Sequence, residues 1–104
     1  MSIRRLPLPV PVIYDAWAAS GRPLVEMVGG DIDVVHVTTT MVPSARRPMV
    51  VTINDLFPLT TPGQFTPRGV RLMSKGVERA RREARLIVCP SEVTAEDCRR
   101  HGFA

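Results

Sequence analysis

Met49-Val-Val-Thr-Ile53, followed at once by Asn54-Asp55, is the stretch that decides the fold of this chain. A run of about five apolar and β-branched residues is typical of a parallel strand that is buried on both faces. Two further runs have the same character, Asp33-Val-Val-His-Val37 and Arg85-Leu-Ile-Val-Cys89. The three runs together predict an α/β fold, a small parallel sheet with flanking helices.

The segments between these runs alternate between helical and loop patterns. Apolar periodicity and capping residues predict helices over 12–20, 24–28, 68–84 and 92–101. The apolar face of the longest helix is expected to consist of Val70, Met73, Val77, Ala80 and Ala84. The stretches 38–47 and 56–67 are predicted to be loops, and the prolines and the glycine of the second nearly exclude helix there. Both loops leave the carboxyl ends of strands.

Length, charge and cysteine usage narrow the class of protein. The chain has 104 residues, enough for one small domain, and its formal net charge of +4 favours anionic partners. Cys89 and Cys98 lack metal-ligand spacing, so no metal and no cofactor is expected, and two reduced thiols are favoured over a disulfide. Neither a secretory signal nor a membrane-spanning run is recognisable. We therefore expect a cytoplasmic protein that can meet the inner face of a membrane only at its surface.

Polar residues follow each predicted strand at the point where the strand ends. In a parallel sheet the carboxyl ends of the strands share one edge, where ligands collect. We expect one shared site there, with Asn54 and Asp55 as catalytic candidates. The substrate-binding candidates are His36, Thr38, Thr39, Ser91 and Glu92.

Each of these residues also has a purely structural interpretation. His36 is about as well explained as a core histidine, and Asn54-Asp55 as a turn whose side chains bind nearby backbone amides. For Ser91 the N-cap of the last helix is favoured over phosphate binding, because Glu92 would repel an anion.

The predicted long helix carries a basic stripe. Its members are spaced by three or four residues, and the membrane-surface candidates among them are Arg68, Arg71, Lys75 and Arg79. Such a stripe is usually only a solvated face, and contact with anionic lipid is the functional alternative. Nucleic acid is not expected as a partner, since no aromatic residues are interleaved with the stripe.

Two segments carry a family resemblance, Val51-Thr-Ile-Asn-Asp-Leu-Phe-Pro58 and Leu86-Ile-Val-Cys-Pro-Ser-Glu-Val-Thr94. They resemble the N-terminal domain of retaining glycosyltransferases of the GT-B fold, in the group-1 or family-four set. The family pattern reads D-V-V-H, then V-V-T-x-H-D-L-x-x-L-x-x-P, a basic helix, and S-E-x-T-x-x-D with a final glycine. The chain matches this order over roughly residues 10 to 104.

The resemblance implies a domain with a Rossmann-like fold that forms the acceptor side of a sugar-transfer cleft. Residues 1–104 would be a single incomplete glycosyltransferase-like N-terminal domain. The nucleotide-diphosphate sugar would bind only together with the missing C-terminal domain, so enzyme activity of the chain itself is left open. A truncated sheet would also favour self-association. The alternative function is a non-catalytic binding or interaction module on the same half-fold.

The chain departs from the family pattern at Asn54, where the family usually carries histidine. An amide donates and accepts hydrogen bonds but does not titrate near neutral pH. The resemblance therefore implies that Asn54 can contact a sugar but cannot act as an acid or base.

Overall fold

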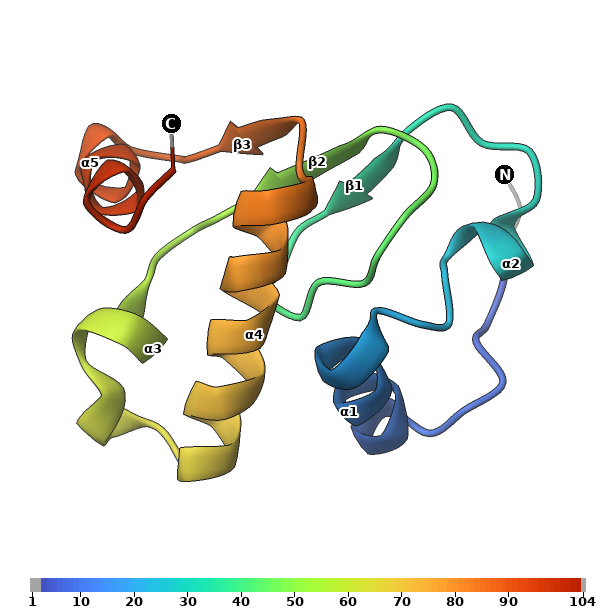
Figure 1. Ribbon diagram of the computed structural model, residues 1–104, viewed down its shortest axis with the longest axis horizontal. Coiled ribbons are helices and arrows are strands. Elements are labelled where there is room, and N and C mark those ends of the chain that lie inside the picture. Colours follow the sequence, from blue (N-terminus) through green and yellow to red (C-terminus); the bar gives the residue numbers. More distant parts are fainter. Residues whose placement is uncertain (1–2, 104) are drawn as a thin grey trace.

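A three-stranded parallel sheet organises the computed structural model, which describes residues 3–103 (Figure 1). The strands are β1 (Val35–Val37), β2 (Met49–Thr52) and β3 (Leu86–Val88), in the order β1-β2-β3. Val51 of β2 lies opposite Val37 on one side and Ile87 on the other. The predicted α/β class is confirmed, as is its partial Rossmann-like character. The expected domain limits of 1–104 include Met1, Ser2 and Ala104, which lie outside the described residues.

The predicted helices are present with slightly different ends. They are α1 (Val10–Ser20), α2 (Glu26–Gly29), α4 (Pro67–Glu83) and α5 (Glu92–Arg100). Gly21 ends α1 in the left-handed conformation, at φ 79°. At the start of α4 the Thr66 side chain accepts a hydrogen bond from the Gly69 amide. Within residues 3–103 no helix is long and apolar enough to cross a bilayer.

One segment that was predicted to be a loop is partly helical. The stretch 56–67 contains the short helix α3 (Phe57–Thr60) and the 3₁₀ turn η1 (Pro62–Gln64). The expectation of no helix there was wrong, because Pro58 and Pro62 occupy first-turn positions, where proline costs no hydrogen bond. The buried side chain of Leu56 anchors the segment to the core. The other predicted loop, 38–47, contains no helix.

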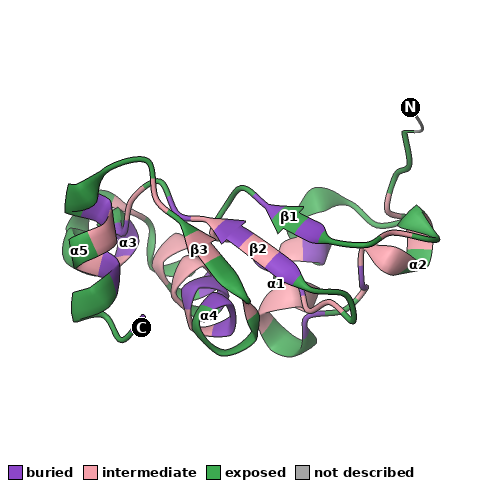
Figure 2. Ribbon diagram, turned by 90° about the horizontal axis from the view of Figure 1, so that it is seen from above, coloured by how far each residue is buried: buried purple, intermediate pink, exposed green. Residues whose placement is uncertain are grey.

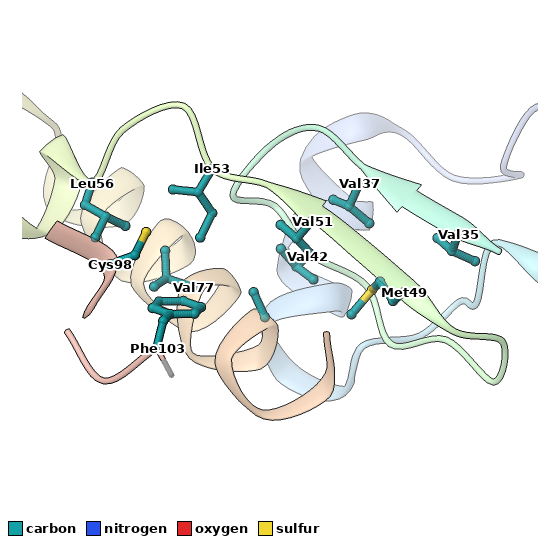
Figure 3. Packing of buried hydrophobic residues seen from close by; sticks show 11 residues of the cluster. Val35, Val37, Val42, Met49, Val51, Ile53, Leu56, Val77, Cys98 and Phe103 are labelled. Carbon is teal, nitrogen blue, oxygen red and sulfur yellow. The ribbon is translucent and has the colours of Figure 1, made fainter. Parts of the chain in front are cut away.

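The core lies between one face of the sheet and α4 (Figure 3). Val51 at its centre has no exposed surface and packs in one cluster with Met49, Val77 and Ala80. The α4 face that packs inward is partly the expected one, since Val77 and Ala80 are buried as predicted and the other three predicted residues are half-buried. Its buried residues are Leu72, Gly76, Val77, Arg79 and Ala80. The predicted face missed Leu72, Gly76, which has no side chain, and Arg79, which is charged.

The opposite face of the sheet is open. Side chains alternate between buried and exposed along β1, and Leu86 and Val88 of β3 are 56% and 41% exposed. Figure 2 shows α1 and α4 on the same side of the sheet, and no described helix lies over the other side. The expectation of strands buried on both faces is therefore wrong for residues 3–103. A continuous β-branched run specifies a strand but does not specify how many faces are covered.

Candidate functional site

A pocket of ≈ 290 Å³ lies where β1 and β2 end. Its lining comes from the loop after β1, from the end of β2 with the turn that follows it, from α3, from the residue after η1 and from α4. The lining residues are Thr38, Thr39, Thr40, Thr52, Asn54, Asp55, Phe57, Pro58, Phe65 and Met73. Asp55 is the one charged side chain among these lining residues. The pocket thus offers hydroxyl, amide and carboxylate groups beside two aromatic rings.

Asn54 is exposed in this pocket and does not point into the core. The buried residues Ile53 and Leu56 on either side of it hold the segment against the core. The Asn54 carbonyl oxygen accepts a hydrogen bond of 3.1 Å from the Thr94 hydroxyl in α5. The backbone of Asn54 is thus fixed to α5, while its exposed residue surface contributes to the pocket lining. The start of α5 therefore lies at the same edge of the sheet as Asn54.

Asp55 has a structural role in the turn after β2. Its Oδ1 accepts a hydrogen bond of 3.1 Å from the amide of Phe57, the first residue of α3. This is the local turn interaction that the structural interpretation of Asn54-Asp55 describes. The same interaction fixes the direction in which α3 leaves the pocket.

Ser91 and Glu92 are placed at the start of α5 and do not line the pocket. The Ser91 hydroxyl accepts a hydrogen bond from the Thr94 amide, so Ser91 is the N-cap of the helix. Glu92 forms an ion pair with Arg99, at 2.8 Å. The link between this helix start and Asn54 is the hydrogen bond from the Thr94 hydroxyl to the Asn54 carbonyl oxygen.

His36 lies on the open face of the sheet, in the middle of β1. Its Nε2 is 2.8 Å from the Thr52 hydroxyl of β2, and its side chain is exposed. It lines a second, larger groove of ≈ 1020 Å³, between the N-terminal segment, α1 and β1. Thr39 lines both hollows. His36 therefore does not line the Asn54 pocket, but it is hydrogen-bonded to Thr52, which does.

The basic stripe on α4 is interrupted. Arg79 is only 6% exposed, and its guanidinium donates to the carbonyl oxygens of Trp17 and Val42 and pairs with Glu83. The expectation of Arg79 as a membrane-surface residue is therefore wrong. Arg68 is exposed but paired with Asp15 at 2.9 Å. These contacts tie α1 to α4, as the proximity of the two helices in Figure 2 also shows.

Sequence reasoning missed several residues of the pocket. Thr52 shares the strand face of His36, two positions after Val50, and period-two alternation along β2 could have identified it. Phe57 belongs to α3 and Phe65 directly follows η1, and neither element was predicted. Among residues 3–103 no group of three or more His, Cys, Asp or Glu side chains could hold a metal ion.

The profile of one family, Glycosyltransferase Family 4, matches residues 2–104. The chain belongs to glycosyltransferase family 4. No match was found among curated proteins or among solved structures. The family-4 match spans both segments that carried the resemblance, from β2 into α3 and from β3 into α5. In the structure these two segments meet at the hydrogen bond between Thr94 and Asn54.

Proposed function

We propose that this family-4 chain forms the acceptor side of a glycosyltransferase that uses a nucleotide-diphosphate sugar. The observation that carries the proposal is the pocket at the ends of β1 and β2, lined by Asn54, Asp55 and three consecutive threonines. Its volume of ≈ 290 Å³ suits a single sugar ring better than a whole nucleotide sugar. Neutral hydroxyl and amide groups match the hydroxyls of a sugar.

In this proposal each polar side chain has a separate task. The Asn54 amide donates to one sugar hydroxyl and accepts from another. The Oδ2 atom of Asp55 accepts a hydrogen bond from a sugar hydroxyl, while Oδ1 continues to accept the hydrogen bond from the Phe57 amide. Phe57 and Phe65 offer flat apolar surfaces to the ring carbons, as aromatic residues do in many binding pockets.

The charge of the pocket favours the acceptor over the donor. A diphosphate carries negative charge, and Asp55, the one charged residue among those that line the pocket, is negative as well. Like charges at close range disfavour binding. We therefore propose that the donor is held by a second α/β domain and that catalysis requires both domains to position their substrates together. A nucleotide-sugar donor also suggests the cytoplasm as the location.

The second candidate is a non-catalytic interaction module. The specific observation in its favour is the open sheet face, on which Leu86 and Val88 are exposed. Exposed apolar surface of this kind often marks a contact with another protein. This alternative predicts binding to a partner through β3 and no affinity of the Asn54 pocket for sugars.

Saturation-transfer NMR on the isolated chain tests the proposal. The ligands are a panel of neutral monosaccharides and simple glycosides, and a second panel of nucleotide-diphosphate sugars. We expect saturation transfer to the ring protons of at least one neutral sugar and weaker transfer to nucleotide sugars. In a separate activity assay with a radiolabelled donor we expect no turnover. Nucleotide sugars as the preferred ligands, or no sugar bound at all, would contradict the acceptor assignment.

A further inference from the structure

Two cysteines from different elements meet beside the start of α5. Cys89 directly follows β3, and Cys98 lies at the end of the second turn of α5. Their sulfur atoms are 3.8 Å apart, and both thiols are free. We propose that Cys89 and Cys98 form a redox-active dithiol, which small-molecule disulfides such as oxidised glutathione convert into an intramolecular disulfide. This modification site is independent of the proposed function.

The fold holds the two sulfurs near bonding distance. Cys98 is 3% exposed and belongs to the core cluster, where Figure 3 shows it close to Leu56. Its carbonyl oxygen also accepts the Phe103 amide at 3.0 Å, which fixes the end of the chain against α5. A disulfide bond is about 2.05 Å long. The sulfurs need to approach by less than about 2 Å, a movement that side-chain rotation can supply.

The difference in burial sets the order of the two reaction steps. Cys89 is half-buried, so its thiolate attacks oxidised glutathione first, forms a mixed disulfide and releases one glutathione thiolate. Cys98 then loses its proton and attacks the Cys89 sulfur, which expels the second glutathione. Two protein thiols are oxidised to one disulfide, and one glutathione disulfide is reduced to two thiols. Burial, and secondly the neighbouring Cys89 thiol, raises the pKa of Cys98 to about 12, so Cys98 keeps its proton at neutral pH and is the poorer first attacker of the two.

The bond would restrain the helix start that adjoins the candidate site. Residues 89–98 enclose Ser91, the N-cap of α5, and Thr94, whose hydroxyl binds the Asn54 carbonyl oxygen. Closing this loop fixes the first turns of α5 relative to β3. The disulfide would therefore close a loop around the helix start that contacts the backbone of Asn54.

The test is a glutathione titration of the reduced 104-residue chain at low micromolar concentration. Free thiols are counted with a thiol-reactive dye, and products are mapped by mass spectrometry of unreduced peptides. The wild type should lose both thiols and gain a Cys89–Cys98 cross-link without bound glutathione. The Cys98→Ser variant should stop as the mixed disulfide at Cys89. The Cys89→Ser variant should react at least tenfold more slowly, because Cys98 is buried.

The same titration in urea measures what the fold contributes. In the unfolded chain the two thiols meet only by loop closure, whereas the folded chain holds them together. We expect the equilibrium constant for disulfide formation to be at least tenfold larger in the folded chain. An equal or smaller constant in the folded chain would overturn the proposal. So would a wild type that accumulates the Cys89 mixed disulfide or forms cross-links between chains instead.

Discussion

Gly76 lets α4 approach the loop after β1 so closely that no side chain fits between them. A Cβ atom built at this position would lie 1.6 Å from the Thr40 carbonyl oxygen. Thr40 in turn lines the candidate pocket. The absence of a side chain at Gly76 thus helps to position the pocket wall. Apolar periodicity along the helix does not indicate this role.

The Gly76→Ala substitution is expected to destabilise the protein by about 2 kcal/mol or more. On helix propensity alone, alanine would stabilise the helix by about 1 kcal/mol, so the clash reverses the sign. Urea unfolding followed by circular dichroism measures the change. Gly63→Ala is the control, because nothing lies within 4 Å of that position. Equal effects of the two substitutions would contradict the close approach.

Arg79 is a second residue whose role depends on burial. Its guanidinium joins α4 to the Trp17 carbonyl oxygen of α1 and to the Val42 carbonyl oxygen of the loop after β1. Arg79→Ala removes these bonds and leaves the buried Val42 carbonyl oxygen unpaired, while the Trp17 carbonyl oxygen keeps its bond from the Gly21 amide. We expect a loss of about 2–4 kcal/mol in unfolding free energy, since hydrogen bonds to charged groups contribute about 1.5–3 kcal/mol each.

The matched control for Arg79→Ala is Arg71→Ala on the same helix. Arg71 is exposed, and surface substitutions away from special features change stability by about 0.5 kcal/mol or less. Urea unfolding of both variants supplies the comparison. If Arg79→Ala were as mild as Arg71→Ala, the guanidinium would not hold the three segments together.

At the scale of elements, the sequence predicted the positions of the strands and helices better than it predicted which of their faces are buried. The runs at 33–37, 49–53 and 85–89 each contain a strand, although each strand is shorter than its run by one or two residues. Gly21 and Ser91 end and begin helices as expected, because capping is a local interaction. The helix α3 was missed because the proline count ignored first-turn positions.

The candidate site was predicted only in part, because the sequence specifies where strands end but not how the elements pack. Thr38, Thr39, Asn54 and Asp55 meet in one pocket because the ends of neighbouring parallel strands must meet. His36 belongs to the middle of its strand, and its position on the open face depends on which face α4 covers. The burial of Arg79 depends on tertiary contacts with α1. Sequence periodicity does not specify which face of the sheet α4 covers, nor which side chains of α4 contact α1.

The basic surface of α4 is smaller than the sequence suggested, and membrane contact remains a proposal for it. With Arg79 buried and Arg68 paired, Arg71 and Lys75 are the exposed cations of the predicted stripe that have no ion pair within residues 3–103. Each basic residue near an anionic surface contributes about 1 kcal/mol. We expect adsorption to anionic vesicles at low ionic strength that is lost at about 0.15 M salt.

A vesicle sedimentation assay measures this adsorption. The double substitution Arg71→Glu with Lys75→Glu should abolish it at low salt. The control is Arg46→Glu with Arg47→Glu, which makes the same charge change on an exposed pair outside α4. Equal losses in the two variants would show that net charge alone, and not the surface of α4, governs adsorption.

At the scale of the whole molecule, the sheet formed by residues 3–103 has one open face and two edge strands. Within the described residues β1 and β3 are edge strands, and Leu86 and Val88 on β3 expose apolar surface. Unpaired edges and exposed apolar faces promote association. We expect the sedimentation coefficient of the isolated chain to rise with concentration in the micromolar range.

Charged substitutions on the open face test this expectation. Leu86→Lys with Val88→Lys should give a monomer at every concentration. Val93→Lys is the control, because Val93 is 74% exposed on α5 and not on the sheet. A wild type that is monomeric throughout, or a control that dissociates as fully as the double variant, would argue against association through the sheet.

The central claim is that sugars bind in the Asn54 pocket, and protein-observed NMR tests it most directly. Amide shifts of the ¹⁵N-labelled chain are followed while the neutral sugar with the strongest saturation transfer is added. The account predicts saturable shifts centred on Thr38, Thr39, Thr40, Asn54 and Asp55. It also predicts about 30-fold weaker binding for Asn54→Ala, equivalent to two hydrogen bonds of about 1 kcal/mol each. Binding should be unchanged for Gln64→Ala, an amide outside the pocket lining. Shifts centred elsewhere, or equal affinities for the Asn54→Ala variant and the wild type, would contradict it.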